Sequence, residues 1–263
     1  MNNRESWTDE DIKDLKYAKS LLENPGLAAR FASAFGTPVE WALAHLPDGV
    51  QNAINVATTS AIETALKFAV TTMEDREQGA LEWIHKTAVA LSGAAGGLFG
   101  VAALPIELPI STTIMLRSIA AIARSEGEKI ATADAQVACV EVFAMGSRLP
   151  SDDGANTAYY AAKAAMAKAV AGAAAFLAGG GKVGGPAAPP LIALIATVAE
   201  RFGVVVSEKV VAQGLPVIGA AGGAIINTMF IDHFQNMARG HFIVRRLERK
   251  FGSEDVEHRY KAD

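Results

Sequence analysis

The sequence predicts an all-α fold, a single multi-helix bundle with Gly- and Ala-rich helices buried in its interior. Apolar residues recur at helical spacing along most of the chain. Helix-start signals are frequent, and the first is Thr8 with Asp11 at capping-box spacing. Residues typical of strands gather only at 204–206, and that run is short enough to be helical as well.

Start and stop signals mark the individual helices. Thr8 opens the first helix, and Asn-Pro-Gly at 24–26 stops it. Pro105 and Pro109 interrupt an apolar stretch, so the next helix is expected only from near Pro109. The Gly- and Pro-rich stretch 179–190 is the clearest loop. In chain order, the expected helices cover about residues 8–23, 50–73, from 76 into a glycine-rich run, 109–125, 132–146, 153–178, 191–202, and a final long helix ending at 251.

Chain length and charge limit the architecture and the partners. A chain of 263 residues can bury a substantial core, and we expect one helical domain with polar tails at 1–7 and 253–263. The net charge is −4 with acids and bases mixed, which argues against nucleic acid as a partner. The polar N-terminus is not a secretory signal, and the single Cys139 cannot form an internal disulfide. We therefore expect a cytoplasmic protein.

Two runs without charged residues, 87–106 and 210–231, are each about long enough to cross a bilayer as a helix. Both contain the letters Gly-Ala-Ala-Gly-Gly. We predict buried helices instead of membrane spans, because Gly and Ala contribute little to insertion and prolines interrupt both runs. Glycines at spacing four let helix backbones approach closely. The predicted helix-packing glycines are Gly93, Gly96, Gly97, Gly100, Gly219 and Gly223.

The last predicted helix becomes basic towards its C-terminal end. Such a cluster is usually a solvated face that complements the helix dipole. Its functional alternative is contact with anionic lipid headgroups, worth about 1 kcal/mol per residue near the surface. His241 lies on the apolar stripe of this helix and is expected to be a hydrogen-bonded core histidine. The basic residues are Arg239, Arg245, Arg246, Arg249 and Lys250.

Catalytic and cofactor motifs are weak in this chain. Gly-Gly-Gly-Lys-Val-Gly at 179–184 has the letters of a dinucleotide-binding loop, but a helix precedes it and prolines follow, so a flexible connector is expected. A metal or catalytic site could be assembled from Glu107, Glu141, Asp232 and His233. The structural alternative is that Glu107 stabilises a helix start, while Asp232 and His233 are ordinary polar positions.

Several short segments resemble the EcsC protein family. Each is short, but the combination is specific and spans roughly residues 41–252. The segments are Gly-Gly-Leu-Phe-Gly at 96–100, Leu-Pro-Ile-Glu-Leu-Pro at 104–109, Leu-Arg-Ser-Ile at 116–119, Ile122 to Arg124 with Gly127-Glu128, Glu-Val-Phe at 141–143, Tyr-Tyr at 159–160, Pro-Val-Ile-Gly-Ala at 216–220, Asn227, Phe230, His233 and the stretch 242–251.

The resemblance implies a mainly helical bacterial protein, cytoplasmic or peripheral to the inner membrane. The family is named for a component encoded beside an ABC transporter, and it implies no particular reaction. It singles out four polar positions within apolar stretches, Glu107, Arg117, Asn227 and His233. Residues 107 and 117 fall on different faces of a helix, so each should find its partner on another helix.

Our leading functional hypothesis is a non-enzymatic helical protein that docks on the cytoplasmic face of the membrane or binds a lipid-like apolar ligand. A transporter or another membrane protein is a candidate partner, and no cofactor is expected. One alternative is a metal-assisted enzyme that uses Glu107, Asp232 and His233. A second alternative is a protein–protein adaptor, which predicts an exposed apolar patch and no ligand.

Overall fold

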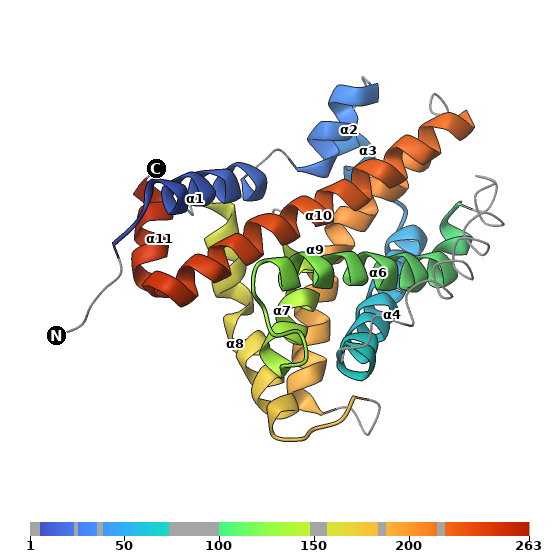
Figure 1. The fold of residues 1–263 in the computed structure, drawn as a ribbon. Coiled ribbons are helices and arrows are strands. Elements are labelled where there is room, and N and C mark those ends of the chain that lie inside the picture. Colours follow the sequence, from blue (N-terminus) through green and yellow to red (C-terminus); the bar gives the residue numbers. More distant parts are fainter. Residues whose placement is uncertain are drawn as a thin grey trace.

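The structure is a computed structural model that describes residues 6–23, 26–35, 39–73, 100–147, 157–183, 188–214 and 219–262. Its described part is helical and contains no strand, which confirms the all-α prediction (Figure 1). The elements are α1 (Asp9–Leu22), α2 (Leu27–Phe35), α3 (Val39–Ala44), α4 (Asp48–Thr72), α6 (Gly100–Ser125), α7 (Ala133–Glu141), the 3-10 helix η2 (Val142–Ala144), α8 (Ala158–Ala178), α9 (Pro189–Gly214), α10 (Gly219–Phe251) and α11 (Ser253–Ala262).

The long helix α10 crosses the molecule and contacts α1, α6, α9 and α11 (Figure 1). Helices α4 and α9 pack against each other, and α4 also packs along α6. The short α7 and η2 lie at the centre, where every residue from 135 to 145 is buried, Cys139 included. Helices α8 and α9 form a hairpin that projects at the bottom of Figure 1.

The predicted helix starts at Thr8 and Thr132 are confirmed. The backbone N–H of Asp11 donates to the Thr8 hydroxyl at 3.2 Å, and the Thr8 N–H donates back to the Asp11 carboxylate at 3.0 Å. The backbone N–H of Ala135 donates to the Thr132 hydroxyl at 3.3 Å. These bonds satisfy amides that a helix leaves unpaired at its first turn. The predicted long helix over 50–73 is observed as α4.

The expected interruption by prolines does not occur, because α6 continues through Pro105 and Pro109. Leu104 and Leu108, one residue before each proline, are buried in the core, whereas Pro105 is exposed. Packing of the apolar face therefore outweighs the backbone hydrogen bonds that proline removes. Residues 203–206 are likewise helical within α9, so the strand-like run is overridden by its packing.

The described residues of the two predicted polar tails pack against each other and against the rest of the fold. Residues 253–262 form α11, whose Val256 and Tyr260 are buried. The ring of Trp7 stacks on Phe251 with centroids 4.1 Å apart, and its indole N–H donates to Asp255 at 2.6 Å. The two ends of the chain thus pack against each other, which sequence patterns could not indicate.

The predicted close packing at glycine is corrected at Gly223. This residue is partly exposed, and a Cβ there would meet no atom within 4 Å, so a larger side chain is not expected to overpack the described structure. A close approach occurs instead at Gly240, where a Cβ would lie 2.5 Å from Leu22 of α1. Gly100 and Gly219 are the first residues of α6 and α10. The predicted positions Gly93, Gly96 and Gly97 lie outside the described residues.

Candidate functional site

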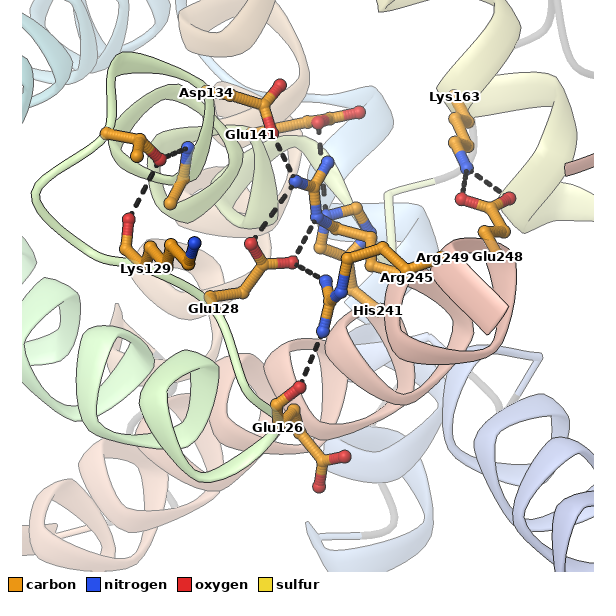
Figure 2. Close-up of polar contacts among 12 residues, drawn as sticks. Glu126, Glu128, Lys129, Asp134, Glu141, Lys163, His241, Arg245, Glu248 and Arg249 are labelled. Carbon is orange, nitrogen blue, oxygen red and sulfur yellow. Dashed lines mark hydrogen bonds and ion pairs between the residues drawn. The ribbon is translucent and has the colours of Figure 1, made fainter. Parts of the chain in front are cut away.

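A buried polar triad lies where α7, α8 and α10 meet. It consists of Glu141, Tyr159 and His241, all buried. The Tyr159 hydroxyl lies 3.0 Å from Nδ1 of His241, and Nε2 of His241 lies 3.9 Å from a Glu141 carboxylate oxygen. The expectation that His241 is a hydrogen-bonded core histidine is confirmed. Figure 2 shows Glu141 and His241 beside Arg245.

Burial determines the charge of the triad. Loss of hydration raises the pKa of Glu141 to about 7, although the positive charges of Lys163 and Arg245 act in the opposite direction. Burial also lowers the pKa of His241 well below its usual range. It raises the pKa of Tyr159 above its ordinary value. All three shifts favour the neutral form of the side chain. Tyr159 and His241 are joined by a hydrogen bond, whereas the 3.9 Å between His241 and Glu141 is longer than one.

Charged residues support the triad from both sides. The Glu23 carboxylate accepts the backbone N–H groups of the first two residues of α8 at 3.1 and 3.2 Å, and the Tyr260 hydroxyl at 3.1 Å. A carboxylate at a helix N-terminus is stabilised by the unpaired amides and by the helix dipole. On the other side, the Lys163 ammonium donates to Glu248 at 2.6 Å (Figure 2). These contacts position α8 against α10.

A small cavity lies beside the triad and is lined by Tyr159 and Gly146 among others. Its volume of about 20 Å³ is room for about one water molecule. Gly146 has a φ of +77°, and a Cβ there would lie 2.5 Å from the His233 ring. His233 is buried, and burial lowers its pKa to about 4. His233 is therefore a neutral side chain packed beneath a glycine turn.

The predicted polar positions Glu107 and Arg117 do find partners on other helices. The buried Lys209 of α9 donates to Glu107 at 3.0 Å, and its ammonium lies 4.8 Å from the centre of the Phe230 ring. The Arg117 guanidinium lies 5.1 Å from the ring centre of Phe68 on α4. Both residues thus join α6 to its neighbours.

The metal constellation is not formed. Glu107 is paired with Lys209, while the neighbours Asp232 and His233 are exposed and buried respectively. Successive residues of a helix point in different directions, and here Asp232 faces solvent while His233 faces the core. Within the described ranges, no group of three or more His, Cys, Asp or Glu residues could hold a metal ion. Asn227, the remaining polar position, is exposed on α10.

Four of the five basic residues near the end of α10 form ion pairs with acidic residues of the same chain, and Figure 2 shows those of Arg245 and Arg249. Arg239 instead donates to the Asn236 side chain at 3.0 Å. The role of this cluster at a membrane surface stays a prediction, and attraction to lipid would have to compete with these pairs. The pairs are Arg245 with Glu128 and Asp134, Arg246 with Glu126 and Asp14, Arg249 with Glu128, and Lys250 with Asp11.

Sequence reasoning missed the acidic partners of these basic residues. They come from α1, from the connection between α6 and α7 and from the first turn of α7, all far from α10 in the sequence. The available signal was the acidic character of residues 126–134 and of the first turn of α1. It could have suggested pairing with the basic helix end, but only the fold decides which charges meet.

Three described helices are long and apolar enough to cross a membrane by length and composition. They do not coincide with the runs 87–106 and 210–231, since the first lies mostly outside the described residues and the second is divided between α9 and α10. Helix α8 differs from the other two because only 17% of its most apolar window is buried inside the structure. The candidate spans are Leu104–Ser125, Ala158–Ala178 and Pro189–Gly214.

Comparison with known families identifies the chain. The model of the EcsC protein family matches residues 10–247, which is most of the sequence. The chain belongs to the EcsC protein family. The match begins earlier than the resemblance at 41–252, so this EcsC protein includes α1 in its family core. No curated protein and no solved structure matched the chain.

Proposed function

We propose that this EcsC protein is a non-enzymatic helical protein that associates with the cytoplasmic face of a membrane without crossing it. The observation that carries the proposal is the exposure of α8, an apolar helix of membrane-spanning length with little of its apolar window buried. An exposed apolar helix face is typical of proteins that bind a membrane or another protein.

The charged residues within the three apolar helices support association over spanning. Helix α9 buries Arg201 and Lys209, and α6 carries Glu107 and Arg117. Lys209 and Glu107 pair with each other across the two helices. Moving such residues into hydrocarbon costs about 2.5 kcal/mol or more for each charged side chain. The Lys209–Glu107 pair is instead compatible with a helical domain that folds in water.

We favour binding to a membrane surface over the apolar-ligand version of the hypothesis, because the cavity that we find among the described residues is small. The cavity beside Tyr159 has about 20 Å³, which is room for one water molecule and far too little for an acyl chain. The adaptor alternative shares the exposed helix α8 and differs only in what covers it. A transporter or other membrane protein remains compatible as a partner at the same surface.

Flotation with vesicles tests this proposal. Purified protein should float with vesicles of phosphatidylglycerol and phosphatidylcholine, and it should float less with phosphatidylcholine alone. Raising the salt concentration to about 0.5 M should weaken flotation, because surface charges are then screened within a few ångströms. Protein that stays at the bottom of the gradient with both vesicle types would contradict the proposal.

A further inference from the structure

The strongest unexplained surface is the α8–α9 hairpin. From residue 157 to residue 199 the chain carries no Asp or Glu, and its charged residues are Lys163, Lys168 and Lys182. Lys163 is occupied by Glu248, whereas Lys168 and Lys182 are exposed. Residues 157–199 therefore carry positive charge and no acidic side chain that anionic headgroups would repel.

An exposed alanine stripe lies between these two lysines. Ala171, Ala175 and Ala178 follow one another at helical spacing on the solvent side of α8, and all three are exposed. Lys168 continues the stripe at one end, and Lys182 stands just beyond its other end. Thirteen uncharged residues, 169–181, separate the two lysines. The stripe is therefore an uncharged surface with a cationic side chain at each end.

The C-terminal end of α8 is closed by backbone hydrogen bonds. The backbone N–H of Gly181 donates to the carbonyl of Phe176 at 3.0 Å, and Gly180 has a φ of +84°. The opposite side of α8 is buried through Met166 and Ala173. The exposed stripe is therefore presented on a fixed helix, so a binding partner need not order it first.

The position of the hairpin also suits a surface contact. Figure 1 shows the end of α8 and the start of α9 at the bottom, away from α1 and α11. Those two helices carry acidic first turns. Residues 157–199 carry lysines and no acidic residue, so a negatively charged membrane would attract the hairpin without opposing repulsion and would favour an orientation with the hairpin towards the lipid.

We propose that the exposed stripe of α8 is the membrane contact, lying along the interfacial layer of an anionic bilayer while Lys168 and Lys182 reach lipid phosphates. This inference rests on the proposed function and names the surface that performs it. The lysine stems lie along apolar atoms and the ammonium groups stay at headgroup level. Alanine buries little apolar area, so the contact depends on anionic lipid in addition to the apolar stripe.

A fluorophore placed on the stripe tests the contact directly. Ala175→Cys can be labelled selectively with an NBD dye, because Cys139 is buried and burial raises the pKa of its thiol. The matched control is Ala262→Cys on α11, which is also an exposed alanine in a helix. With phosphatidylglycerol-containing vesicles, NBD at 175 should shift to shorter wavelength and brighten at least twofold, and NBD at 262 should not. Equal responses at both positions would overturn the inference.

Charge reversal supplies the second arm. K168E/K182E should lose at least tenfold in vesicle affinity, whereas K13E/K129E, with the same change in net charge at exposed lysines elsewhere, should lose less than threefold.

Failure of the wild-type protein to float would contradict the proposed function itself. Flotation of wild type with equal losses in both double variants would remove only the inference. Disulfide-linked dimers of Ala175→Cys in quantitative yield without vesicles would assign the stripe to a second copy of the chain and also overturn it.

Discussion

Replacing Glu107 by Gln should lower the free energy of unfolding by about 3 kcal/mol, because it leaves the buried ammonium of Lys209 without a counter-charge. The Lys209 side chain is 3% exposed, and that of Glu107 is 20% exposed. The Phe230 ring near the ammonium offsets only part of the loss, since a cation–π contact is worth about 1–2 kcal/mol. Urea unfolding followed by circular dichroism measures the difference.

A double-mutant cycle separates this ion pair from simple packing effects. Adding Lys209→Met to Glu107→Gln should recover much of the loss, because the stranded charge is removed. As a control, Glu257→Gln breaks the surface ion pair between Glu257 and Lys261, whose side chains are 41% and 42% exposed. This change should lower the free energy of unfolding by less than about 0.5 kcal/mol. Additive losses at 107 and 209 would show that the pair is not coupled and would contradict the structural role of Glu107.

Replacing Glu141 by Gln should change how stability depends on pH. The pKa of Glu141 is about 7 in the folded protein and 4.5 when unperturbed, so the folded state holds the proton more tightly. Its contribution to stability is therefore fully present below pH 4.5 and is lost as pH rises towards 7. The Glu141→Gln variant lacks this loss, so it should gain about 2 kcal/mol relative to wild type between pH 5 and pH 8.

The buried histidines oppose Glu141 in this pH range. The pKa of His233 falls from 6.5 to about 4 on folding, so its contribution is present above pH 6.5 and is lost as pH falls. In Glu141→Gln the histidine effect stands alone, and stability should rise more steeply from pH 5 to 6.5. Chemical unfolding at several pH values checks this, with the exposed Glu63→Gln as control. Parallel curves for wild type and Glu141→Gln would contradict a raised pKa at this carboxyl.

Local signals in the sequence predicted the helices well where capping and periodicity agreed. The Thr8 capping box, the start of α7 at Thr132 and the long helix α4 all depend on neighbours within a few residues. Prediction failed where distant packing outweighs a local rule. Helix α6 continues through two prolines because its buried face packs on the core, and α11 is helical because Val256 and Tyr260 are buried.

The candidate site was predictable only in part. The expectation that His241 is a core histidine followed from its place on an apolar stripe, but its contacts with Glu141 and Tyr159 join three helices and leave no local trace. The basic end of α10 was visible in the sequence, whereas its acidic partners were not paired with it in advance. The exposure of α8 could not be predicted either, because an alanine-rich sequence does not distinguish a helix face that is buried from one that is exposed to solvent.

Extraction of the protein from native membranes tests most directly whether it rests on a membrane without crossing it. The membrane fraction of cells that produce the protein would be washed with 1 M salt and then with alkaline carbonate before any detergent. We expect the protein to be present in that fraction and these washes to release most of it. Retention until detergent is added would contradict association without crossing, because it would mean that an apolar segment of the chain, such as one of the three described candidate spans, is held within the hydrocarbon.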